Sequence, residues 1–373
     1  MKILVLNWKD HHHPLAGGAE DFTYNIMKRL AQDGHEIVWF TSLYPGAKET
    51  SHEDGIDFVR SGSYRTVHGK SKAFIRAISP GNKPDVILDE VNTRPFNPSR
   101  WLRVNVPVVN LIHQLAREVW FQETPLPVAL VGRYALENYW LKAIKNHLTV
   151  TVSESTEEDL RNLGFERIRL VYNALEVIPK RTSIEKDNPP KIVYLGRLSR
   201  GKRPKDCLEA FRLVRRERPC TMTVMGDGPL MPTLQKRYPE VDFLGHVSET
   251  TKRSVLSRAT FILASGTREG WNRGVLEAQA YGVVPVVQNI HGLRDAVGKG
   301  KAGIMVPTRN PKEIAKSVLS LFDKEKYLRE LSQNCIEWAS LFSYSKSKSQ
   351  FESVLTACAL GEPDPYLDTH VSG

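Results

Sequence analysis

Short apolar runs alternate with helix-like segments along almost the whole chain, and the alternation occurs twice. The first series comprises KILVLN, HEIVWFTS, IDFVR, DVILDE, VPVVNLIH, LTVTVS and IRLVYN, and the second comprises KIVYLGR, TMTVMGDG, VDFLGH, TFILAS, VVPVVQ and GIMVP. Strands that alternate with helices form a parallel sheet with helices on its faces. Because 373 residues exceed one ordinary domain, the sequence predicts two α/β domains, each a doubly wound parallel sheet.

A polar, proline-rich stretch without periodicity separates the two series. It covers residues 174–190 and predicts a linker between an N-terminal domain of residues 1–173 and a C-terminal domain of residues 191–345. Residues 346–360 form the last helical segment. Residues 361–373 have little to bury and predict a flexible tail.

The composition is typical of a globular protein, with 41% hydrophobic and 25% charged residues. No apolar run approaches the ~20 residues that span a bilayer, and the N-terminus becomes polar too early for a signal peptide. We expect reduced, buried thiols in the absence of CxxC spacing among Cys207, Cys220, Cys335 and Cys358. These features predict a cytoplasmic protein.

The charge balance predicts an anionic partner. The net charge is +10 and the isoelectric point lies near 9.3, which suits nucleic acid, an anionic membrane face or a phosphorylated substrate. The chain has no zinc-finger spacing, RNP-like aromatic motif or separate basic arm, so we do not expect it to bind nucleic acid.

The stretch EGWNRGVLEAQAYG, residues 269–282, carries two glutamates eight positions apart. Glu269 should lie on a strand-to-helix loop and Glu277 about one turn inside the helix. The leading N–H groups of that helix, from Asn272 to Gly274, would form an anion site. A carboxylate on either side of a phosphate site suits a nucleotide sugar, which has hydroxyls at both ends of a diphosphate.

The GGAE sequence, residues 17–20, follows the first predicted strand and opens the first helix. Gly17 and Gly18 let the backbone approach a ligand closely, and the helix N-terminus favours an anion. An ordinary tight turn is the alternative. The dinucleotide fingerprint G-x-G-x-x-G is absent, which argues against a dehydrogenase.

The sequence GRLSRGKR, residues 196–203, matches most of a phosphate-binding P-loop. Arg203 stands where such a loop needs Ser or Thr for magnesium, which argues against an ATPase. The chain also contains no D-x-D sequence to hold a manganese-bound sugar nucleotide. Both observations predict a metal-independent protein.

Histidines at two places could carry chemistry. We expect no metal at His11, His12 and His13, because consecutive side chains rarely converge on one ion and no second Cys/His cluster accompanies them. His113 ends the strand VPVVNLIH, at the sheet edge where α/β proteins bind ligands. There it could contact a ligand, or simply be a capping or core histidine.

The ordered set of GGAE, the strand that ends in His113, GRLSRGK, GDGP at residues 226–229 and the paired glutamates resembles the retaining glycosyltransferases of family four. The resemblance extends over nearly the whole chain. It implies a GT-B fold, in which two Rossmann-like doubly wound domains face each other across a cleft, and a last helix that crosses back to the N-terminal domain. It also implies transfer with retention, with the acceptor near GGAE.

The resemblance implies a role for each motif. Arg197 and Lys202 would clamp the diphosphate, Glu277 would bind the ribose, and Glu269 and His113 would hold the transferred sugar, with Glu118 as a less certain neighbour. The implied catalytic residues are Glu269, His113, Arg197 and Lys202. The implied donor-binding residues are Gly17, Gly18, Arg197, Lys202, Gly226, Val247, Glu269, Asn272, Arg273, Gly274 and Glu277. Relatives usually carry small residues where Asn272 and Arg273 stand, so the sugar remains open.

The expected activity is transfer of a hexose-type sugar from a UDP- or GDP-linked donor to a glycan or lipid-linked acceptor, with no metal or other cofactor. A nucleotide-sugar epimerase or hydrolase on the same fold is one alternative, which rapid donor hydrolysis without an acceptor would favour. A non-catalytic sugar- or nucleic-acid-binding protein is another, which binding without turnover would favour.

The segment from residue 117 to residue 147 mixes aromatic and basic side chains. They are Trp120, Phe121, Tyr139 and Trp140, with Arg117, Arg133, Lys142 and Lys145. Such a mixture suits a helix that lies on an anionic membrane, which would place the protein at the cytoplasmic membrane face. A buried helix that flanks a sheet has a similar sequence, and both interpretations stay open here.

Overall fold

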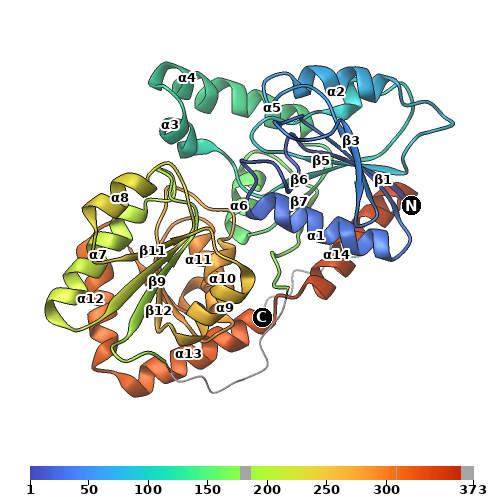
Figure 1. Cartoon of the computed structure of the whole chain (residues 1–373). Coiled ribbons are helices and arrows are strands. Elements are labelled where there is room, and N and C mark those ends of the chain that lie inside the picture. The colour runs from blue at the N-terminus through green and yellow to red at the C-terminus, as the bar shows by residue number, and fades with distance from the viewer. Residues whose placement is uncertain (177–185, 308, 363–373) are drawn as a thin grey trace. The chain divides into compact units, whose positions relative to one another are not determined.

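The computed structural model describes residues 1–176, 186–307 and 309–362, and the chain folds into two compact units (Figure 1). The first unit comprises Met1–Arg117, Leu130–Ala174 and the segment from Tyr344 onward. The second comprises Glu118–Ala129 and Leu175–Ser343. Parts of the predicted linker, residues 177–185, and of the predicted tail, residues 363–373, lie outside the described residues.

The sheet of the first unit has the order β3-β4-β2-β1-β5-β6-β7-β8. All its strand pairs are parallel except β3 with β4. Its strands are β1 (Lys2–Leu6), β2 (Glu36–Thr41), β3 (Thr50–Glu53), β4 (Ile56–Arg60), β5 (Val86–Glu90), β6 (Val108–Ile112), β7 (Leu148–Thr151) and β8 (Ile168–Leu170). The predicted strands are confirmed. The sequence analysis missed β3, because its residues TSHE are polar and only partly buried.

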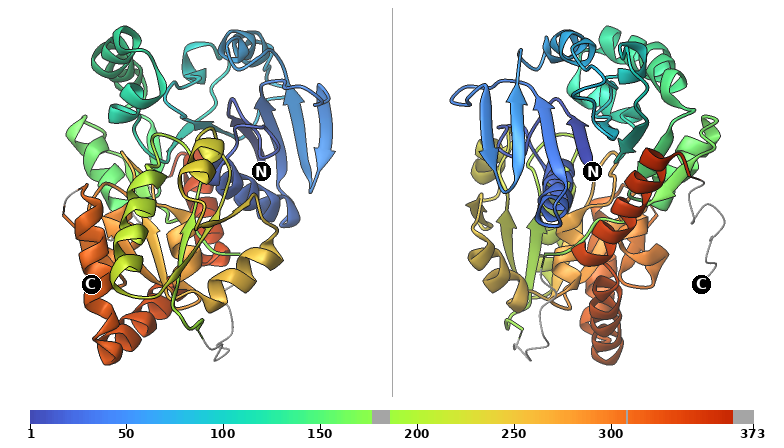
Figure 2. Two further views of the ribbon diagram at one scale, coloured as in Figure 1. Left: turned by 60° about the vertical axis from the view of Figure 1, so that its left-hand side comes forward. Right: turned by 90° about the vertical axis from the view of Figure 1, so that its right-hand side faces the viewer.

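Helices cover both faces of this sheet. On one face α1 (Gly18–Gln32) packs beside α14 (Tyr344–Leu360), which Figure 2 shows side by side, and α14 also contacts β5 and β6. The predicted apolar face of α1 is buried, from Phe22 to Leu30. Phe22 packs on Phe351 of α14, with ring centroids 6.4 Å apart.

The other face carries α2 (Val67–Arg76) and α5 (Glu137–Ile144). Val67 and Ile75 of α2 share a core with Val108 of β6, while Ile144 of α5 shares a core with Ile112. Residues 108 and 112 project from the same face of β6, because side chains alternate along a strand. Hence α2 and α5 lie on the same face of the sheet. The remaining elements of the first unit are η1 (Pro98–Arg100), η3 (Gly132–Leu136) and α6 (Glu154–Asn162). The boundary between the two units falls within η2 (Arg117–Val119) and within α4 (Leu126–Val131).

The sheet of the second unit has the order β11-β10-β9-β12-β13-β14, and all its pairs are parallel. Its strands are β9 (Lys191–Leu195), β10 (Thr221–Met225), β11 (Asp242–Gly245), β12 (Phe261–Ala264), β13 (Val284–Gln288) and β14 (Ile304–Val306). Its helices are α3 (Trp120–Glu123), α7 (Pro204–Glu217), α8 (Met231–Arg237), α9 (Glu249–Arg258), α10 (Arg273–Gln279), α11 (Leu293–Ala296), η4 (Gly298–Gly300), α12 (Pro311–Phe322) and α13 (Glu325–Ser340). The predicted second α/β alternation is therefore confirmed.

Each sheet has a point at which the strand order reverses. In the second unit β9 pairs with both β10 and β12, and in the first β1 pairs with both β2 and β5. Loops at the carboxyl ends of such strand pairs form the ligand site in open α/β sheets. The reversal therefore places the GRLSRGK loop beside the loop that contains Glu269.

Two further expectations concern the whole chain. Within the described ranges, no helix has the length and apolar character needed to cross a membrane. Cys207, Cys220 and Cys335 are buried free thiols as expected, whereas Cys358 is only half-buried.

Candidate functional site

Backbone contacts join the two loops at the reversal point of the second unit. The N–H of Thr267, after β12, donates to the carbonyl of Gly201 over 2.7 Å. The hydroxyl of Ser265 donates to the carbonyl of Arg203, also over 2.7 Å. The GRLSRGK loop and the loop that carries Glu269 are therefore one structural feature, although more than sixty residues separate them along the chain.

A charged pair lies where the two loops meet. Lys202 Nζ is 2.5 Å from Glu269 Oε2, and Glu269 is buried, with 3% of its surface exposed. Among the described residues, the other carboxylate oxygen, Glu269 Oε1, has no hydrogen-bond partner. A buried carboxylate oxygen without a donor is costly, on the order of 1–3 kcal/mol. The site therefore offers a charged acceptor for a ligand hydroxyl.

Glycines keep the backbone of these loops closely packed. At Gly274, at the start of α10, a Cβ would lie 2.8 Å from the carbonyl oxygen of Leu195. At Gly226, whose φ is +130°, a Cβ would lie 2.1 Å from the carbonyl oxygen of Gly196. Neither position admits a side chain without movement of the backbone, so a third loop, after β10, is packed against the same feature.

The first turn of α10 differs in detail from the expected anion site. Asn272 is the N-cap in a left-handed conformation, with φ +75°, and its Oδ1 accepts the N–H of Val275 over 3.1 Å. The cap thus satisfies the N–H of Val275. The predicted anion-binding amides, from Asn272 to Gly274, come just before it and make no intrahelical bond in the first turn of a helix.

Glu277 lies on α10 as predicted, but it has a cationic neighbour that the sequence analysis missed. Lys252 Nζ of α9 is 2.8 Å from Glu277 Oε2, and Arg273 Nη2 is 3.9 Å from Oε1. Burial lowers the pKa of Lys252, but the carboxylates of Glu277 and Glu249 outweigh that effect and raise it. A ribose bound to Glu277 would share this carboxylate with a lysine that stays charged.

The remaining predicted donor residues follow neighbouring strands. Arg197 is exposed on the loop after β9, and the N–H of Gly226 donates to the carbonyl of Gly245 over 2.7 Å, so the loops after β10 and β11 touch. Val247 is half-buried just before Ser248, the N-cap of α9. These residues lie along one carboxyl edge of the sheet.

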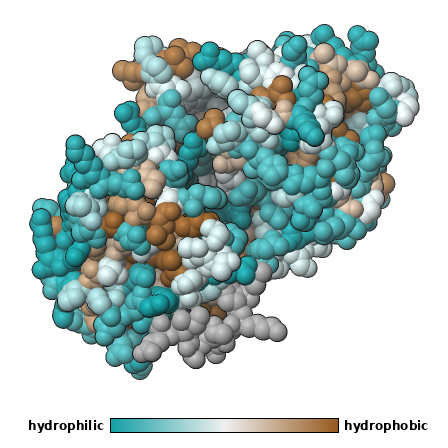
Figure 3. Space-filling view, in the orientation of Figure 1, coloured by the Kyte–Doolittle hydropathy of each residue, from teal (hydrophilic) through white to brown (hydrophobic). Residues whose placement is uncertain are grey.

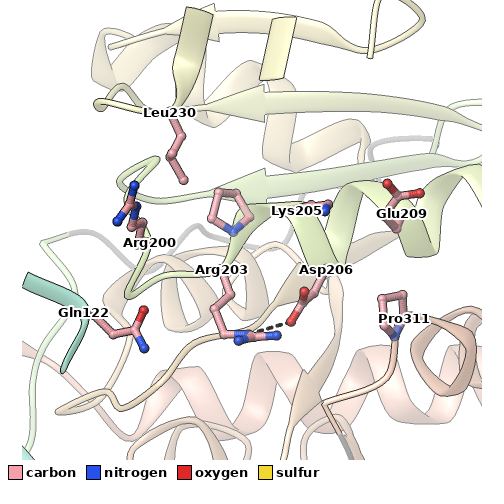
Figure 4. Close-up of a pocket in the computed structure, with 9 residues that line it drawn as sticks. Gln122, Arg200, Arg203, Lys205, Asp206, Glu209, Leu230 and Pro311 are labelled. Atoms are coloured by element: carbon pink, nitrogen blue, oxygen red, sulfur yellow. Dashed lines mark hydrogen bonds and ion pairs between the residues drawn. The ribbon is translucent and has the colours of Figure 1, made fainter. Parts of the chain in front are cut away.

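A separate pocket of about 570 Å³ opens beside the same loop (Figure 4). It is lined by Gln122, Arg200, Arg203, Pro204, Lys205, Asp206, Glu209, Leu230 and Pro311. Arg203 Nε lies 2.7 Å from Asp206 Oδ2, so the residue that replaces the magnesium ligand of a P-loop is engaged in an ion pair. No predicted donor residue lines this pocket, which is therefore not the predicted donor site.

The carboxyl edge of the first unit carries His113, Gly17 and Gly18. His113 Nε2 lies 3.4 Å from Glu90 Oε1, at the end of the neighbouring strand β5. Glu90 is fully buried, and burial raises its pKa although His113 counteracts the shift. The sequence analysis overlooked Glu90, although the two acids that end DVILDE could have indicated it.

Glu20 holds the glycine turn of GGAE in place. Its carboxylate accepts the N–H of Gly17 over 2.8 Å and lies 3.0 Å from Lys9 Nζ. Asn92, after β5, donates to the same carboxylate over 3.2 Å. The turn is thus built around the buried carboxylate of Glu20. The sequence analysis treated this residue only as part of the GGAE motif.

The geometry of the consecutive histidines differs from the expectation. His12 Nε2 lies 2.8 Å from Glu53 Oε2, and His11 Nε2 lies 3.6 Å from Glu53 Oε1. The two rings converge on one carboxylate because the β3–β4 turn, which the sequence analysis missed, brings Glu53 to them. Burial, followed by the neighbouring His12, lowers the pKa of His11. Their ligand atoms lie within 4.8 Å of one another, close enough to hold an ion.

Glu118, predicted as a less certain neighbour of His113, belongs to a different unit from His113. It groups with the second unit, where its Oε2 lies 3.3 Å from Nη1 of the buried Arg268. Of the aromatic residues singled out nearby, Tyr139 is 63% exposed, Phe121 is exposed, and Trp120 and Trp140 are half-buried.

Comparisons with known proteins cover both units. Residues 16–177 match the family described as Glycosyltransferase Family 4, and residues 189–324 match the family described as Glycosyl transferases group 1. Glycogen synthase of Mycobacterium tuberculosis is 25% identical over 362 residues, which cover 87% of this chain and 86% of that protein.

Solved structures share the fold. Sucrose-phosphate synthase from Thermosynechococcus elongatus aligns with a TM-score of 0.77 at 16% identity, covering 97% of this chain and all of that one. Anabaena HepE, solved with UDP and glucose, aligns with a TM-score of 0.71 at 17% identity, covering 96% of this chain and all of that one.

Proposed function

This chain is a family 4 glycosyltransferase with the GT-B fold, and from that premise we propose that it transfers a hexose from a nucleoside diphosphate sugar with retention of configuration. The donor would carry UDP or GDP, and the acceptor would be a glycan or a lipid-linked sugar. The relatives named for glycogen and sucrose-phosphate synthesis, and the HepE complex with UDP and glucose, support a hexose donor.

The proposal rests on the Lys202–Glu269 pair. One oxygen of Glu269 is held by Lys202 at 2.5 Å, and the other is buried without a donor in the described part of the chain. A sugar hydroxyl supplies the missing donor, while the ammonium group of Lys202 lies beside a loop suited to a diphosphate. One pair of residues can therefore contact both the sugar and the leaving group of the same donor.

The leaving diphosphate gains negative charge as the glycosidic bond breaks. Arg197 and Lys202, on the loop after β9, and the leading amides of α10 would stabilise that charge, which fixed donors do best in a site from which water is excluded. Arg197 would add a planar fork that matches two phosphate oxygens. No metal ion is needed in this scheme, and attack and departure would occur on the same face of the sugar.

His113 and the GGAE turn would serve the sugar and the acceptor. His113 can donate or accept a hydrogen bond to a hydroxyl, and Glu90, 3.4 Å from its Nε2, would set the proton position on the ring. Gly17 and Gly18 at the start of α1 would lie near the acceptor. We place the reaction in the cytoplasm, where nucleotide sugars and reduced thiols are both available.

A donor screen tests the proposal. Thermal-shift and hydrolysis assays over UDP- and GDP-linked hexoses should identify one donor that raises Tm and is turned over slowly without an acceptor. Glu269→Gln should abolish turnover of that donor, whereas the matched control Glu325→Gln, an exposed acid on α13, should behave as the parent. Binding of no nucleotide sugar, or full turnover by Glu269→Gln, would refute the assignment.

A further inference from the structure

Two histidines and a glutamate converge beside the loop that leads into the GGAE turn. His12 Nε2 lies 2.8 Å from Glu53 Oε2, and His11 Nε2 lies 3.6 Å from Glu53 Oε1. The ligand atoms of the three residues all lie within 4.8 Å of one another. Two atoms bound to a tetrahedral zinc ion at its usual bond lengths are roughly 3.3–3.5 Å apart. The two separations fall on either side of that value, so these three residues, the His–His–Glu cluster, have the spacing of metal ligands.

The backbone that carries the two histidines is held in place by a buried ion pair. Arg60 of β4 donates from Nε to Asp10 Oδ2 over 2.6 Å, and both side chains are buried. The other carboxylate oxygen of Asp10 accepts the N–H of His12 over 3.0 Å. The N–H of His13 donates to the carbonyl of Asp10 over 3.1 Å. Ligands on a backbone fixed in this way lose little conformational freedom when an ion binds.

Tyr24 of α1 orients the side chains of the cluster. Its ring stacks on the His11 ring, with centroids 3.6 Å apart and planes at 16°. Its hydroxyl donates to Glu53 Oε1 over 3.4 Å and also to the carboxylate of Asp54. That carboxylate lies 2.7 Å from Lys28 Nζ. Because groups that hold metal ligands in position commonly change affinity by about 10–100-fold, Tyr24 makes the cluster a better site than its three ligands alone.

His11 has the properties of a metal ligand rather than of a surface histidine. Its side chain is nine-tenths buried, with 10% of its surface exposed. Burial, and after it the neighbouring His12, lowers the pKa of His11, so the ring is neutral at physiological pH, the form that binds metal ions. Its Nδ1 is buried and has no hydrogen-bond partner among the described residues. A buried polar atom without a partner indicates that a water or an ion completes the site.

The cluster is open to water on its other side. The side chains of His12 and Glu53 are 53% and 40% exposed. Hydrophilic side chains, drawn in teal, gather over the neighbouring helix α1 in the space-filling view (Figure 3). An ion can therefore reach the cluster from solvent, which a metal site requires.

We propose that His11, His12 and Glu53 bind one zinc ion, with a water molecule in the fourth position. Two imidazole nitrogens and one carboxylate oxygen form a ligand set that zinc accepts, whereas magnesium and calcium prefer six or more oxygen atoms. The site lies wholly in the first unit and uses no residue of the proposed donor site. The inference therefore stands independently of the proposed function.

The bound ion would have a structural role. It would join the loop after β1 to the β3–β4 hairpin, because the histidines come from the loop and Glu53 comes from the end of β3. The same loop continues into Gly17 and the start of α1. Zinc would thus stabilise the approach to the GGAE turn without taking part in the departure of the diphosphate.

Metal titration of the untagged chain tests the proposal. After treatment with EDTA and desalting, the parent should bind one zinc ion per chain in a calorimetric titration, and zinc should raise its Tm. Cobalt should give the strong visible absorption of a four-coordinate ion, which the aqueous ion lacks. His11→Gln, His12→Gln and Glu53→Gln should each lower zinc affinity at least about tenfold and remove the rise in Tm. A parent chain that binds no zinc would refute the proposal.

A second histidine–carboxylate pair on the same hairpin supplies the matched control. His52 Nδ1 lies 2.7 Å from Asp57 Oδ1, and the side chain of His52 is 66% exposed, but the pair does not belong to the cluster. His52→Gln should therefore bind zinc as the parent does. Equal loss of affinity in His52→Gln and Glu53→Gln would mean that zinc binds non-specifically to surface histidines, which overturns the proposal.

His13→Gln separates the cluster from the run of three histidines. His13 Nδ1 accepts the N–H of Leu15 over 3.0 Å, so this residue is engaged elsewhere and its loss should leave zinc affinity unchanged. Parental affinity in Glu53→Gln together with loss in His13→Gln would assign binding to the consecutive histidines alone and refute the site. The Tm shift caused by a nucleotide sugar should be the same with and without zinc, which keeps the outcome for zinc distinct from that for the donor.

Discussion

Lys202 and Glu269, 67 positions apart in sequence, form a 2.5 Å ion pair at the point where the strand order of the second sheet reverses. The pair joins the two motifs on which the proposed chemistry depends. It also links their roles, because any change to the lysine leaves a buried carboxylate without its counter-ion. Predictions for the donor site therefore start from this contact.

Removal of the ammonium group should slow the chemical step. We expect Lys202→Ala to lower kcat by about a hundredfold or more, the usual effect of losing one transition-state donor. Lys205→Ala, in the pocket beside the loop, is the matched control and should retain activity. Steady-state kinetics with the identified donor provide the measurement, and near-parental kcat in Lys202→Ala would contradict the assignment.

The shape of the cation at Arg197 should matter as well as its charge. Arg197→Lys keeps the positive charge but loses the planar fork that binds two phosphate oxygens at once. We expect at least a tenfold loss of kcat/KM. The exposed Arg200→Lys on the same loop serves as control and should keep parental kcat/KM. Parental kcat/KM in Arg197→Lys would show that only the positive charge matters at this position.

Turnover should persist in EDTA. Arg197, Lys202 and backbone amides would stabilise the charge on the leaving group. Removal of metal ions by the chelator should therefore leave the rate of turnover unchanged. Activity measured with and without chelator, then with added manganese, decides the point. Loss of activity in EDTA with recovery on manganese would falsify the metal-independent mechanism.

Glu277 should contribute to nucleotide binding in a manner coupled to Lys252. Glu277→Ala should weaken binding of the nucleoside diphosphate by roughly 1–3 kcal/mol, the cost of losing hydrogen bonds to a charged group. Lys252 lies 2.8 Å from this carboxylate, so the double variant should not be additive. Calorimetric titration of the parent, both single variants and the double variant measures the coupling. Unchanged affinity in Glu277→Ala would remove the ribose assignment.

Stability should fall as the pH rises toward neutrality because of Asp89. Burial raises the pKa of this carboxyl from 3.8 to about 7. Between these values the folded state holds a proton that the unfolded state releases, so the free energy of unfolding decreases with rising pH. The effect is at most about 4 kcal/mol. Urea denaturation from pH 4 to pH 8 should show this slope in the parent and a flatter one in Asp89→Asn.

Alternation of strands and helices was sufficient to predict both sheets, because buried parallel strands are apolar on both faces. The site motifs were also visible, since glycines and charges at strand ends have few structural uses. The residues that contact these motifs could not be predicted from the sequence. Lys252 reaches Glu277 from another helix, and Glu53 reaches the histidines through a polar hairpin, so both contacts depend on tertiary packing rather than on local sequence.

Exposure was the other property that the sequence could not supply. The composition of residues 126–144 suited equally a buried helix and a surface helix, because periodicity does not reveal how many faces are covered. Only the structure distinguishes them: five positions form a buried stripe, while Val131, Tyr134 and Tyr139 face outward.

The last helix has a consequence for how the protein is made. The sheet of the first unit is complete once β8 ends at Leu170, but α14, which packs on α1, β5 and β6, begins only at Tyr344. During synthesis the surface of Phe22 that later contacts Phe351 stays uncovered by α14 until the ribosome has translated the entire second unit. The N-terminal half would therefore expose apolar surface to chaperones and to other nascent chains throughout that interval. Chains cut before residue 344 should accumulate as aggregates, and restoring α14 as a separate peptide should reduce their aggregation.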